Sequence, residues 1–347
     1  MAEDSLAGRL ARAITLGGPI PVAHFMAAAN THYYATRDPL GKAGDFITAP
    51  EISQMFGELI GLCLADLWLR TDKPEVHYVE LGPGRGTLAR DAGKAMAMVG
   101  LEPCVHFVET SPVLRASQLA LFPDAEFHDD ISTLPDHAPL IIVANEFFDA
   151  LPVHQLIKHD GKWHQRLVGY EGDAFVPMIG NQVPDEIIPE ELQGSPQGSV
   201  IETSPASVAI MRDMSKRISR QGGAMIVIDY GYKGPAIGDT LQSIRAHEHT
   251  QPFNNPGEQD MTAHVDFETL GAVGEIEGAR VFGTVGQGQW LTRLGLVERT
   301  NALISVHPAR ADQFNGERDR LASADGMGDL FRVLALTAPG WPEPDGF

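Results

Sequence analysis

The sequence has few cysteines, no cluster of basic residues and no long apolar run. Its two cysteines, Cys63 and Cys104, stand among apolar residues, which predicts reduced core thiols rather than a disulfide framework or a cysteine metal site. No apolar segment approaches the roughly 20 residues that a transmembrane helix requires. The N-terminal region lacks the apolar core of a signal peptide, and its acidic start argues against a mitochondrial presequence. We therefore expect a soluble cytoplasmic protein.

Basic charge is also scarce. Lys and Arg number 26 against 46 Asp and Glu, so the formal net charge is −20. Without a basic patch there is nothing to neutralise a phosphate backbone, and nucleic acid is disfavoured as a partner. A cationic ligand or a basic peptide would be attracted instead. With 347 residues, 43% of them hydrophobic, the chain can bury the core of one large domain or two modest ones.

Several catalytic signatures are missing as well. The sequence contains no internal repeat, no G-x-S-x-G nucleophile motif and no P-loop. Three histidines in a turn-rich region, His247, His249 and His264, have neither E-x-x-H nor C-x-x-C spacing around them. We therefore predict no metal site.

The most informative stretch present runs from Val76 to Leu88. An apolar, β-favouring segment ends in the loop Gly82-Pro83-Gly84-Arg85-Gly86, and apolar residues then recur at the spacing of one helix face. This pattern predicts a strand, a tight loop and a helix. Glycines let backbone N–H groups approach a ligand closely at the positive end of a helix.

The ligand predicted for this loop carries adenosine but no polyphosphate. The glycines read G-x-G-x-G, and Glu80 stands just before Gly82. A carboxylate there would repel the pyrophosphate of a dinucleotide but would suit a cation. S-adenosylmethionine, with its sulfonium and amino groups, fits both conditions. The alternative is a purely structural turn.

Acidic residues end the next two predicted strands. Glu109 closes the strand that begins at Cys104, 23 residues after Gly86, before a helix that starts with Ser111 as N-cap. A carboxylate at this point of a βαβ unit is placed to bind ribose hydroxyls, although an acid that only favours the helix start is the alternative. Asp130 follows a third short strand and is our candidate for the adenine amino group.

A buried strand, Pro139 to Ala144, then leads into Asn145-Glu146-Phe147-Phe148-Asp149. Ligands bind at the carboxyl ends of strands in open α/β sheets. We therefore place Asn145 beside the cofactor and consider Glu146 and Asp149 as catalytic acids. The two phenylalanines are more typical of core residues than of substrate contacts.

The rest of the chain predicts additions to this sheet. Residues 1–72 read as an N-terminal helical cap, in which Thr48 is a possible N-cap of a helix running to Trp68. Residues 73–347 read as the main α/β domain. Insertions are expected at about 153–200, with hairpin patterns, and at about 234–271, which is long and turn-rich. The last strands are expected at 281–294 and 331–336.

Five motifs in order resemble the MidA-like S-adenosylmethionine-dependent methyltransferases, a family that includes the mitochondrial complex I assembly factor that methylates arginine. The matching stretches are Gly44-Asp45-Phe46-Ile47-Thr48-Ala49-Pro50-Glu51-Ile52-Ser53-Gln54-Met55-Phe56-Gly57, Glu80-Leu81-Gly82-Pro83-Gly84-Arg85-Gly86, Asn145-Glu146-Phe147-Phe148-Asp149-Ala150-Leu151-Pro152, Asp229-Tyr230-Gly231 and Thr262-Ala263-His264-Val265-Asp266-Phe267. They extend from near the N-terminus into the second half of the chain.

The resemblance implies a Rossmann-like, seven-stranded methyltransferase fold of the α/β class with helical and hairpin additions. It also implies the substrate class, a protein arginine that ends as symmetric dimethylarginine. For a bacterial relative, the implied partner is a subunit of respiratory complex I, and a homodimer is left open as the assembly.

For a methyltransferase of this kind, we expect the following roles for the candidate residues. Gly82, Gly84 and Gly86 would admit the amino acid end of the cofactor, Glu80 its ammonium, Glu109 the ribose and Asp130 the adenine. Glu146 and Asp149 are the candidates that orient the acceptor guanidinium. Asp45 and Glu51, with His264 and Asp266, would complete the acceptor pocket.

Three other functions compete with this reading. A non-enzymatic cofactor-binding assembly chaperone would share the glycine loop but would have no use for paired acids after the strand. A methyltransferase for a small molecule is compatible with the insertions. A dinucleotide oxidoreductase is disfavoured by the glycine spacing and by Glu80.

Overall fold

The computed structural model describes residues 4–38, 41, 44–45 and 47–347. The chain divides into two compact units. The sheet unit comprises Ile47–Phe148, Ile210–Gly231 and Thr269–Phe347, and the hairpin unit comprises Met1–Phe46, Asp149–Ala209 and Tyr232–Glu268. The predicted domains were 1–72 and 73–347; here residues 47–72 fall in the sheet unit, whereas 149–209 and 232–268, with most of the predicted insertions, fall in the hairpin unit. Phe46, part of the first motif, lies outside the described residues.

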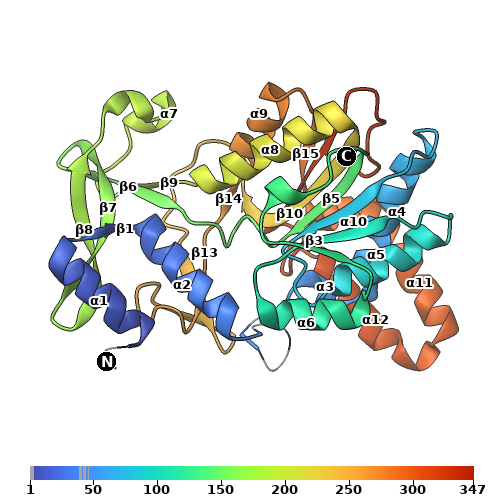
Figure 1. Ribbon diagram of the computed structural model, residues 1–347, viewed down its shortest axis with the longest axis horizontal. Helices are drawn as coiled ribbons and strands as arrows, with labels where there is room; N and C mark the ends of the chain where they lie inside the picture. Colours follow the sequence, from blue (N-terminus) through green and yellow to red (C-terminus); the bar gives the residue numbers. More distant parts are fainter. Residues whose placement is uncertain (1–3, 39–40, 42–43, 46) are drawn as a thin grey trace. The chain divides into compact units, whose positions relative to one another are not determined.

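The main path of the sheet in the sheet unit has the strand order β15-β16-β10-β5-β2-β3-β4. Strands β15, β10, β5 and β3 are labelled in Figure 1. The bounds of the strands on this path are β2 His77–Leu81, β3 Cys104–Val108, β4 Glu126–His128, β5 Leu140–Asn145, β10 Gly223–Tyr232, β15 Arg280–Gly286 and β16 Phe331–Thr337. The five strands from β10 to β4 pair in parallel, whereas β16 is antiparallel to both of its neighbours. Strand order reverses between β2 and β5. This mixed sheet with its accompanying helices confirms the predicted α/β fold class.

The central strands β5 and β10 are rich in apolar residues because parallel sheets are covered on both faces. Every residue of β2 and β5 is buried. The helices that accompany the sheet are α3 Ala49–Ile52, α4 Gln54–Leu69, α5 Thr87–Ala97, α6 Pro112–Leu121, α8 Pro205–Gln221, α9 Phe267–Ile276, α10 Gln287–Arg293, α11 Leu296–Val306 and α12 Ala311–Ala322. Among the described residues, no helix combines the length and the apolarity needed to cross a bilayer.

One predicted helix is divided. The helix expected from Thr48 to Trp68 is interrupted at Ser53, whose backbone is extended, so that α3 ends at Ile52 and α4 begins at Gln54. The Ser53 hydroxyl accepts a hydrogen bond from the Met55 N–H and caps α4, whereas the Thr48 side chain makes no capping bond. A serine favours a cap over a helix interior because its hydroxyl competes for backbone N–H groups.

Helices α4 and α5 pack unusually closely. A Cβ built on Gly61 would lie 2.4 Å from the Ala92 carbonyl oxygen, and one on Gly57 would lie 3.0 Å from the Asp91 Cβ. Only glycine allows this approach. The contact holds the helix that follows the glycine loop against α4.

The hairpin unit combines two helices, α1 Leu6–Gly17 and α2 Val22–Thr36, with antiparallel strands. One sheet has the order β1-β7-β6-β9, with β8 paired to β7, and the other has the order β12-β11-β13. The strands are β1 Ile20–Pro21, β6 His154–His159, β7 Lys162–Glu171, β8 Ala174–Gln182, β9 Val200–Thr203, β11 Gln242–Arg245, β12 Glu248–Thr250 and β13 Asp260–Thr262. The hairpins predicted after residue 153 are present.

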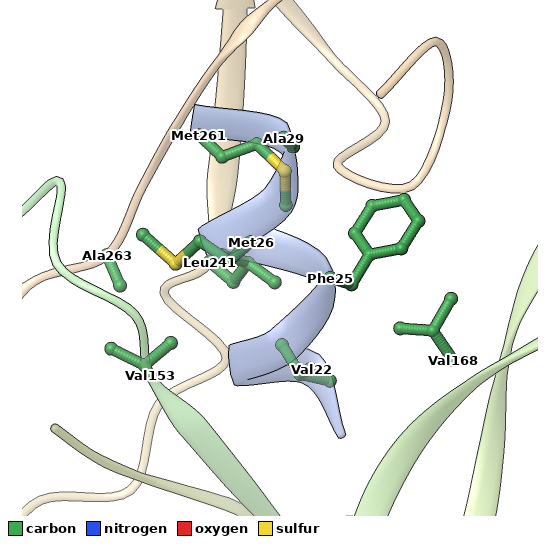
Figure 2. Packing of buried hydrophobic residues seen from close by; sticks show 9 residues of the cluster. All are labelled: Val22, Phe25, Met26, Ala29, Val153, Val168, Leu241, Met261 and Ala263. Atoms are coloured by element: carbon green, nitrogen blue, oxygen red, sulfur yellow. The ribbon is translucent and has the colours of Figure 1, made fainter. Parts of the chain in front are cut away.

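The core of this unit brings together segments that are far apart in sequence. Figure 2 shows α2 at its centre, surrounded by residues of the other two segments. The cluster consists of Val22, Phe25, Met26, Ala29, Val153, Val168, Leu241, Met261 and Ala263.

The turn-rich 234–271 insertion contains the small sheet β12-β11-β13, which the sequence did not predict. Two local predictions were wrong. Cys104, predicted as a core thiol, is exposed at the first residue of β3. The strand expected from Val281 to Leu294 ends at Gly286, and α10 follows it. Trp290 and Leu291 are buried on α10, so apolar residues that read as a strand in fact mark the buried face of a short helix.

Candidate active site

The glycine loop follows β2 next to the point where strand order reverses, and its geometry depends on three glycines. Gly82, Gly84 and Gly86 have φ values of 64°, 55° and 80°, in the left-handed region that glycine adopts without strain. Gly86 is the N-cap of α5. A Cβ on Gly82 would lie 3.0 Å from the Phe147 ring. The loop therefore presents backbone at a helix N-terminus, as a small ligand requires.

Glu80 lies beneath this loop and is 3% exposed. The Tyr78 hydroxyl donates to it over 2.8 Å, and the Ala89 backbone N–H also bonds to its carboxylate. Burial raises the pKa of Glu80 to about 8, despite both hydrogen bonds. Its proposed role toward the cofactor ammonium stays a prediction, and it would require the carboxyl to lose its proton on binding.

Glu51 reaches the start of α5. The Thr87 hydroxyl donates to Glu51 over 2.5 Å, and an Arg85 guanidinium nitrogen lies 3.8 Å from the other carboxylate oxygen. The carboxylate thus interacts with two residues of the glycine-loop region, within the sheet unit.

Glu109 lies at the end of β3 and is buried. One carboxylate oxygen accepts from the Ser111 N–H over 2.8 Å and the other from the Gln118 amide over 3.3 Å. Burial raises its pKa against these hydrogen bonds. Ser111 caps α6 as predicted, because its hydroxyl accepts from the Leu114 N–H.

Gln118 is a site residue that sequence reasoning missed. It is fully buried, and its amide nitrogen donates to the Gly84 carbonyl over 2.6 Å as well as to Glu109. Gln118 therefore connects the glycine loop to the acid at the end of the next strand. A buried glutamine one helical turn before the end of α6 carries no local signal, since its partners lie 34 and 9 residues away.

Asp130 follows β4, and Asn145 is the last residue of β5. The Asp130 carboxylate caps a short 3₁₀ turn by accepting from the Ser132 N–H over 2.7 Å, and this interaction lowers its pKa. Asp130 is exposed, so it remains accessible to a ligand. Asn145 donates to Glu146 over 3.3 Å. Contact of either residue with the cofactor stays a prediction.

Glu146 has the most constrained conformation of the candidate acids. Its φ of 49° is in the left-handed region, which is uncommon for a residue with a side chain and is often found at functional sites. Its carboxylate also accepts from the Ala49 N–H over 3.3 Å. Asp229, fully buried at the end of β10, accepts from the N–H groups of Phe147 and Phe148 over 3.2 and 3.0 Å.

Asp229 therefore positions the segment after Glu146. The sequence marked Asp229 only as part of a motif and assigned it no role. The Asp229 carboxylate accepts the hydrogen bonds of the Phe147 and Phe148 N–H groups, which buried backbone groups require. It thereby fixes the turn that contains Glu146.

The other predicted catalytic residues belong to the hairpin unit. Asp45 accepts from the Tyr33 hydroxyl over 2.5 Å and from the Ala246 N–H over 2.7 Å. Asp149 is buried. A third acid, Asp260, interacts electrostatically with both Asp45 and Asp149. Its carboxylate accepts a hydrogen bond from the Tyr34 hydroxyl over 2.8 Å. Burial, reinforced by the charge of Asp149 and more weakly by that of Asp45, raises the pKa of Asp260 to about 7.

The hairpin unit thus groups Asp45 and Asp149 around an acid that sequence reasoning did not select. Asn30 of α2 stabilises this arrangement, since its amide donates to the carbonyls of Ala150 and Met261 over 3.0 and 2.7 Å. Asp260 could have been noticed only as a polar residue two positions before the motif that begins at Thr262.

His264 belongs to an adjacent hydrogen-bond network. Its backbone N–H donates to the Thr240 hydroxyl over 2.8 Å, and Thr240 in turn donates to the buried Glu202. Burial lowers the pKa of His264. Asp266 is close enough to raise the pKa of Tyr232 electrostatically. Catalytic roles for His264 and Asp266 stay predictions.

The sheet unit has polar groups that suit an adenosine-bearing cofactor. Within the part of the chain that the structure describes, the Asn145 Oδ1 and Gln118 Oε1 atoms are buried and have no hydrogen-bond partner. Such groups are costly to bury unless a water or a ligand completes them. Asn145 ends β5, and Gln118 contacts the glycine loop, so both are associated with the edge where the sheet predicts ligand binding.

Comparison with known proteins agrees with this assignment. Residues 59–285 match the model of a family described as "Putative S-adenosyl-L-methionine-dependent methyltransferase". The protein arginine methyltransferase NDUFAF7 homolog, mitochondrial, of Drosophila melanogaster is 34% identical over 96% of this chain and 85% of its own length. The human mitochondrial protein arginine methyltransferase NDUFAF7 is 31% identical over 92% of this chain and 80% of its own length.

A solved structure is similar along the whole chain. It is a "likely methyl transferase" from Burkholderia thailandensis bound to S-adenosyl-homocysteine. The two proteins are 27% identical with a TM-score of 0.86, and the match covers 98% of this chain and 93% of the other.

Proposed function

This chain belongs to the family of S-adenosylmethionine-dependent methyltransferases, and we propose that it methylates a guanidinium nitrogen of arginine in a protein. The relatives from fly and human are named protein arginine methyltransferases and align with more than nine tenths of this chain. An excess of 20 negative charges favours a basic acceptor.

The observation that carries the proposal is the geometry at Glu146. This acid follows a central strand at the ligand-binding edge of the sheet, is held in a left-handed conformation, and precedes two N–H groups that Asp229 fixes. A structural turn would more readily use glycine or asparagine at this φ. A carboxylate at this position, Glu146, supports a role in orienting a cationic acceptor.

Arginine is a difficult nucleophile because its guanidinium has a pKa above about 12 and stays protonated. A carboxylate that pairs with the outer nitrogens localises charge on them and leaves the attacking nitrogen a more available lone pair. We assign this task to Glu146; catalytic roles for Asp149 and Asp45 stay predictions. Alignment of nucleophile and methyl group, with water excluded, supplies most of the rate enhancement in such a displacement.

S-adenosylmethionine, when bound, supplies a methyl group on a sulfonium, and the electrons of the broken C–S bond return to sulfur. In our proposal the backbone of Gly82, Gly84 and Gly86 admits its amino acid end, and Glu80 lies nearest to the ammonium. Glu109 binds the ribose hydroxyls and Asp130 the adenine. Asn145 and Gln118 contribute buried amide oxygens that need a partner.

The finer parts of the proposal rest on family resemblance. We propose symmetric dimethylation, a respiratory complex I subunit as the acceptor, and a cytoplasmic location in a bacterial cell, with a homodimer as one assembly to test. The fly and human relatives are named as mitochondrial.

The test is methylation of cell extract. The purified protein is incubated with labelled S-adenosylmethionine and an extract from a strain that lacks it, and modified peptides are identified by mass spectrometry. Methylated arginine on a protein is the expected result. Methylation confined to small molecules would contradict the arginine proposal, and cofactor binding without release of S-adenosylhomocysteine would favour the assembly chaperone.

A further inference from the structure

Four histidines that have no role assigned above form a continuous chain in the sheet unit. His77 lies on β2, His106 on β3, His128 on β4, and His137 precedes β5. The nitrogen–nitrogen distances are 3.3 Å from His137 to His77, 2.9 Å from His77 to His106 and 3.1 Å from His106 to His128. Such a row of imidazoles needs a physical explanation.

Strand register places the first three on one face of the sheet. Val79 pairs with His106, and Val108 pairs with His128, so each histidine is two residues further along its strand than the previous one. Residues paired across parallel strands share a face, and alternate residues along a strand do too. His77 and His106 therefore lie on the face opposite to Glu80.

Glu126 completes a set of three metal-binding groups with His106 and His128. Glu126 pairs with His106 and stands two residues before His128, so all three side chains leave the same face. The His106 Nδ1 lies 3.1 Å from His128 Nε2 and 3.7 Å from a Glu126 carboxylate oxygen. Among the described residues this is the group whose ligand atoms, all within 4.8 Å of one another, could hold a metal ion.

We propose that His106, Glu126 and His128 bind one divalent transition-metal ion, with Zn²⁺ as the best chemical match. Donor atoms around a tetrahedral Zn²⁺, at about 2.0–2.2 Å from the ion, are about 3.3–3.6 Å apart. The two separations from His106 Nδ1, 3.1 and 3.7 Å, lie on either side of this range. Two imidazoles and one carboxylate leave a fourth position for water, as in three-ligand zinc sites.

The surroundings satisfy the remaining nitrogens of both histidines. His106 Nε2 faces His77 Nδ1, and the other nitrogen of His77 faces His137. His128 Nδ1 lies 2.8 Å from the Thr133 hydroxyl, which donates to the Asp130 carbonyl over 2.9 Å. When these outer nitrogens carry the protons, Nδ1 of His106 and Nε2 of His128 present lone pairs to the metal. Metal-bound histidines typically have such outer partners.

The charge state of the two histidines and the exposure of Glu126 also suit a metal ion at this position. Burial lowers the pKa of His106 and of His128, so both rings favour the neutral form that binds metals. The Glu126 side chain is 70% exposed and supplies both the negative charge and a route from solvent. Strand β4 has only three residues and is at the edge of the sheet. A metal there would fasten it to β3 and restrict the segment leading to Asp130.

This site differs from the sequence prediction, which was no metal and which considered only His247, His249 and His264. The competing explanation is a metal-free hydrogen-bond chain, in which every histidine is neutral and donates once, ending at Thr133. That chain requires the His106 Nδ1–H to donate to His128 and gives Glu126 no part. The carboxylate therefore separates the two explanations.

The experiment uses the full-length protein after treatment with a chelator. ZnCl₂ is titrated calorimetrically, bound metal is counted by mass spectrometry after gel filtration, and Co²⁺ is added to detect the absorbance of a tetrahedral site. We expect one equivalent of Zn²⁺. His106→Ala and His128→Ala should each weaken binding at least about 100-fold, because each removes a direct ligand and loss of an outer-shell partner alone costs 10–100-fold.

Glu126→Gln is the decisive variant because the side chain is exposed and its loss should leave folding intact. We expect it to weaken Zn²⁺ binding at least about tenfold. Glu248→Gln and His249→Ala, exposed residues of the hairpin unit, are matched controls that should retain the full equivalent. Failure of the wild-type protein to take up Zn²⁺ or Co²⁺, or equal binding by Glu126→Gln, would overturn the proposal in favour of the hydrogen-bond chain.

Discussion

The two units position their candidate residues in different ways. In the sheet unit, Glu80, Glu109, Asn145 and Glu146 all stand at or next to the ends of parallel strands. In the hairpin unit, Asp45 and Asp149 come from separate chain segments and interact electrostatically with Asp260, and the Tyr33 hydroxyl donates to Asp45. A strand end is a local feature, whereas a group of acids drawn from three segments exists only after folding.

The comparison shows which parts of the site should tolerate change. Residues of the sheet unit are fixed by a buried backbone ladder, so substitutions there should alter ligand contacts without moving the scaffold. The acids of the hairpin unit depend on individual partners such as Tyr33 and Asn30. Loss of one partner should disturb several acids together.

The largest effect is expected from Glu146→Gln. Methyl transfer should fall at least about 100-fold, the lower end of what a positioned acid–base group contributes, while S-adenosylmethionine affinity changes little. Turnover and calorimetric binding are measured on the same preparation. Glu102→Gln, an exposed glutamate before β3, is the control and should behave as wild type. Retained turnover would remove Glu146 from the acceptor site.

Gly61→Ala tests whether the sheet unit is as tightly packed as its glycines indicate. The added Cβ would meet the Ala92 carbonyl at 2.4 Å, so α4 and α5 must separate. We expect the free energy of unfolding to fall by about 2–3 kcal/mol in urea titrations. Gly93→Ala, on α5 with no atom within 4 Å of its Cβ, should instead be neutral or stabilising by up to about 1 kcal/mol. Equal results for both variants would contradict the close packing.

Asn30→Ala is the corresponding change in the hairpin unit. It removes two donated bonds and leaves the Met261 N–H, which donates to Asn30 over 3.2 Å, without its partner. We expect a loss of about 2 kcal/mol, because buried groups left unsatisfied are expensive. Hydrogen exchange at Met261 should accelerate. Asn181→Ala, at an exposed position, serves as the control. Unchanged hydrogen exchange at Met261 in Asn30→Ala would contradict a stabilising role for the Asn30 hydrogen bonds.

Glu109→Ala addresses the cofactor directly. We expect S-adenosylmethionine binding to weaken at least tenfold, about 1.4 kcal/mol, through loss of charge-assisted hydrogen bonds. Ser111→Ala, which removes the cap of α6 but keeps the carboxylate, separates the local role of Glu109 from ligand binding. If the two variants lose the same affinity, Glu109 acts only as a support for the helix start.

The last prediction concerns pH and compares a buried acid from each unit. The pKa values of Glu80 and Asp260 are raised to about 8 and about 7, from ordinary values of 4.5 and 3.8. Between these limits the folded protein binds more protons than the unfolded chain, so stability is greatest below the ordinary values and declines as pH rises. Above about pH 8 the decline from these two groups should stop.

Urea titrations from pH 5 to pH 9 should show this decline, and Glu80→Gln and Asp260→Asn should each make it shallower. Glu75→Gln, an exposed acid before β2, should leave the slope unchanged. An unaltered slope in both test variants would mean that neither carboxyl holds a proton in the folded state at neutral pH.

Sequence reasoning succeeded where the decisive information is local. The left-handed conformations of Gly82, Gly84 and Gly86 follow from a glycine loop between a strand and a helix, and Ser111 caps α6 because serine, proline and an apolar face come in that order. The predictions were wrong where a local pattern fits two structures equally well. Ser53 divides a predicted helix, and Trp290 belongs to a helix that resembled a continued strand.

Other features had no local signal. Gln118 meets its Gly84 partner across 34 residues of sequence, and Asp229 reaches N–H groups more than 80 residues earlier. The histidine chain is the clearest example, because His77, His106 and His128 are separated by 29 and 22 residues. Their contact depends on strand order and register, which residue spacing does not reveal.

The sequence by itself determined the α/β class, the glycine loop, the acids at the strand ends and the resemblance that led to the family. These depend on side-chain periodicity and on backbone preferences, which act over a few residues. Tertiary structure alone decided that Asp260 joins Asp45 and Asp149, that Asp229 holds the turn after Glu146, and that histidines from three strands align beside Glu126. The reason is physical: hydrogen bonds and electrostatic interactions depend on distance in space, and only the packed core brings distant segments within that distance.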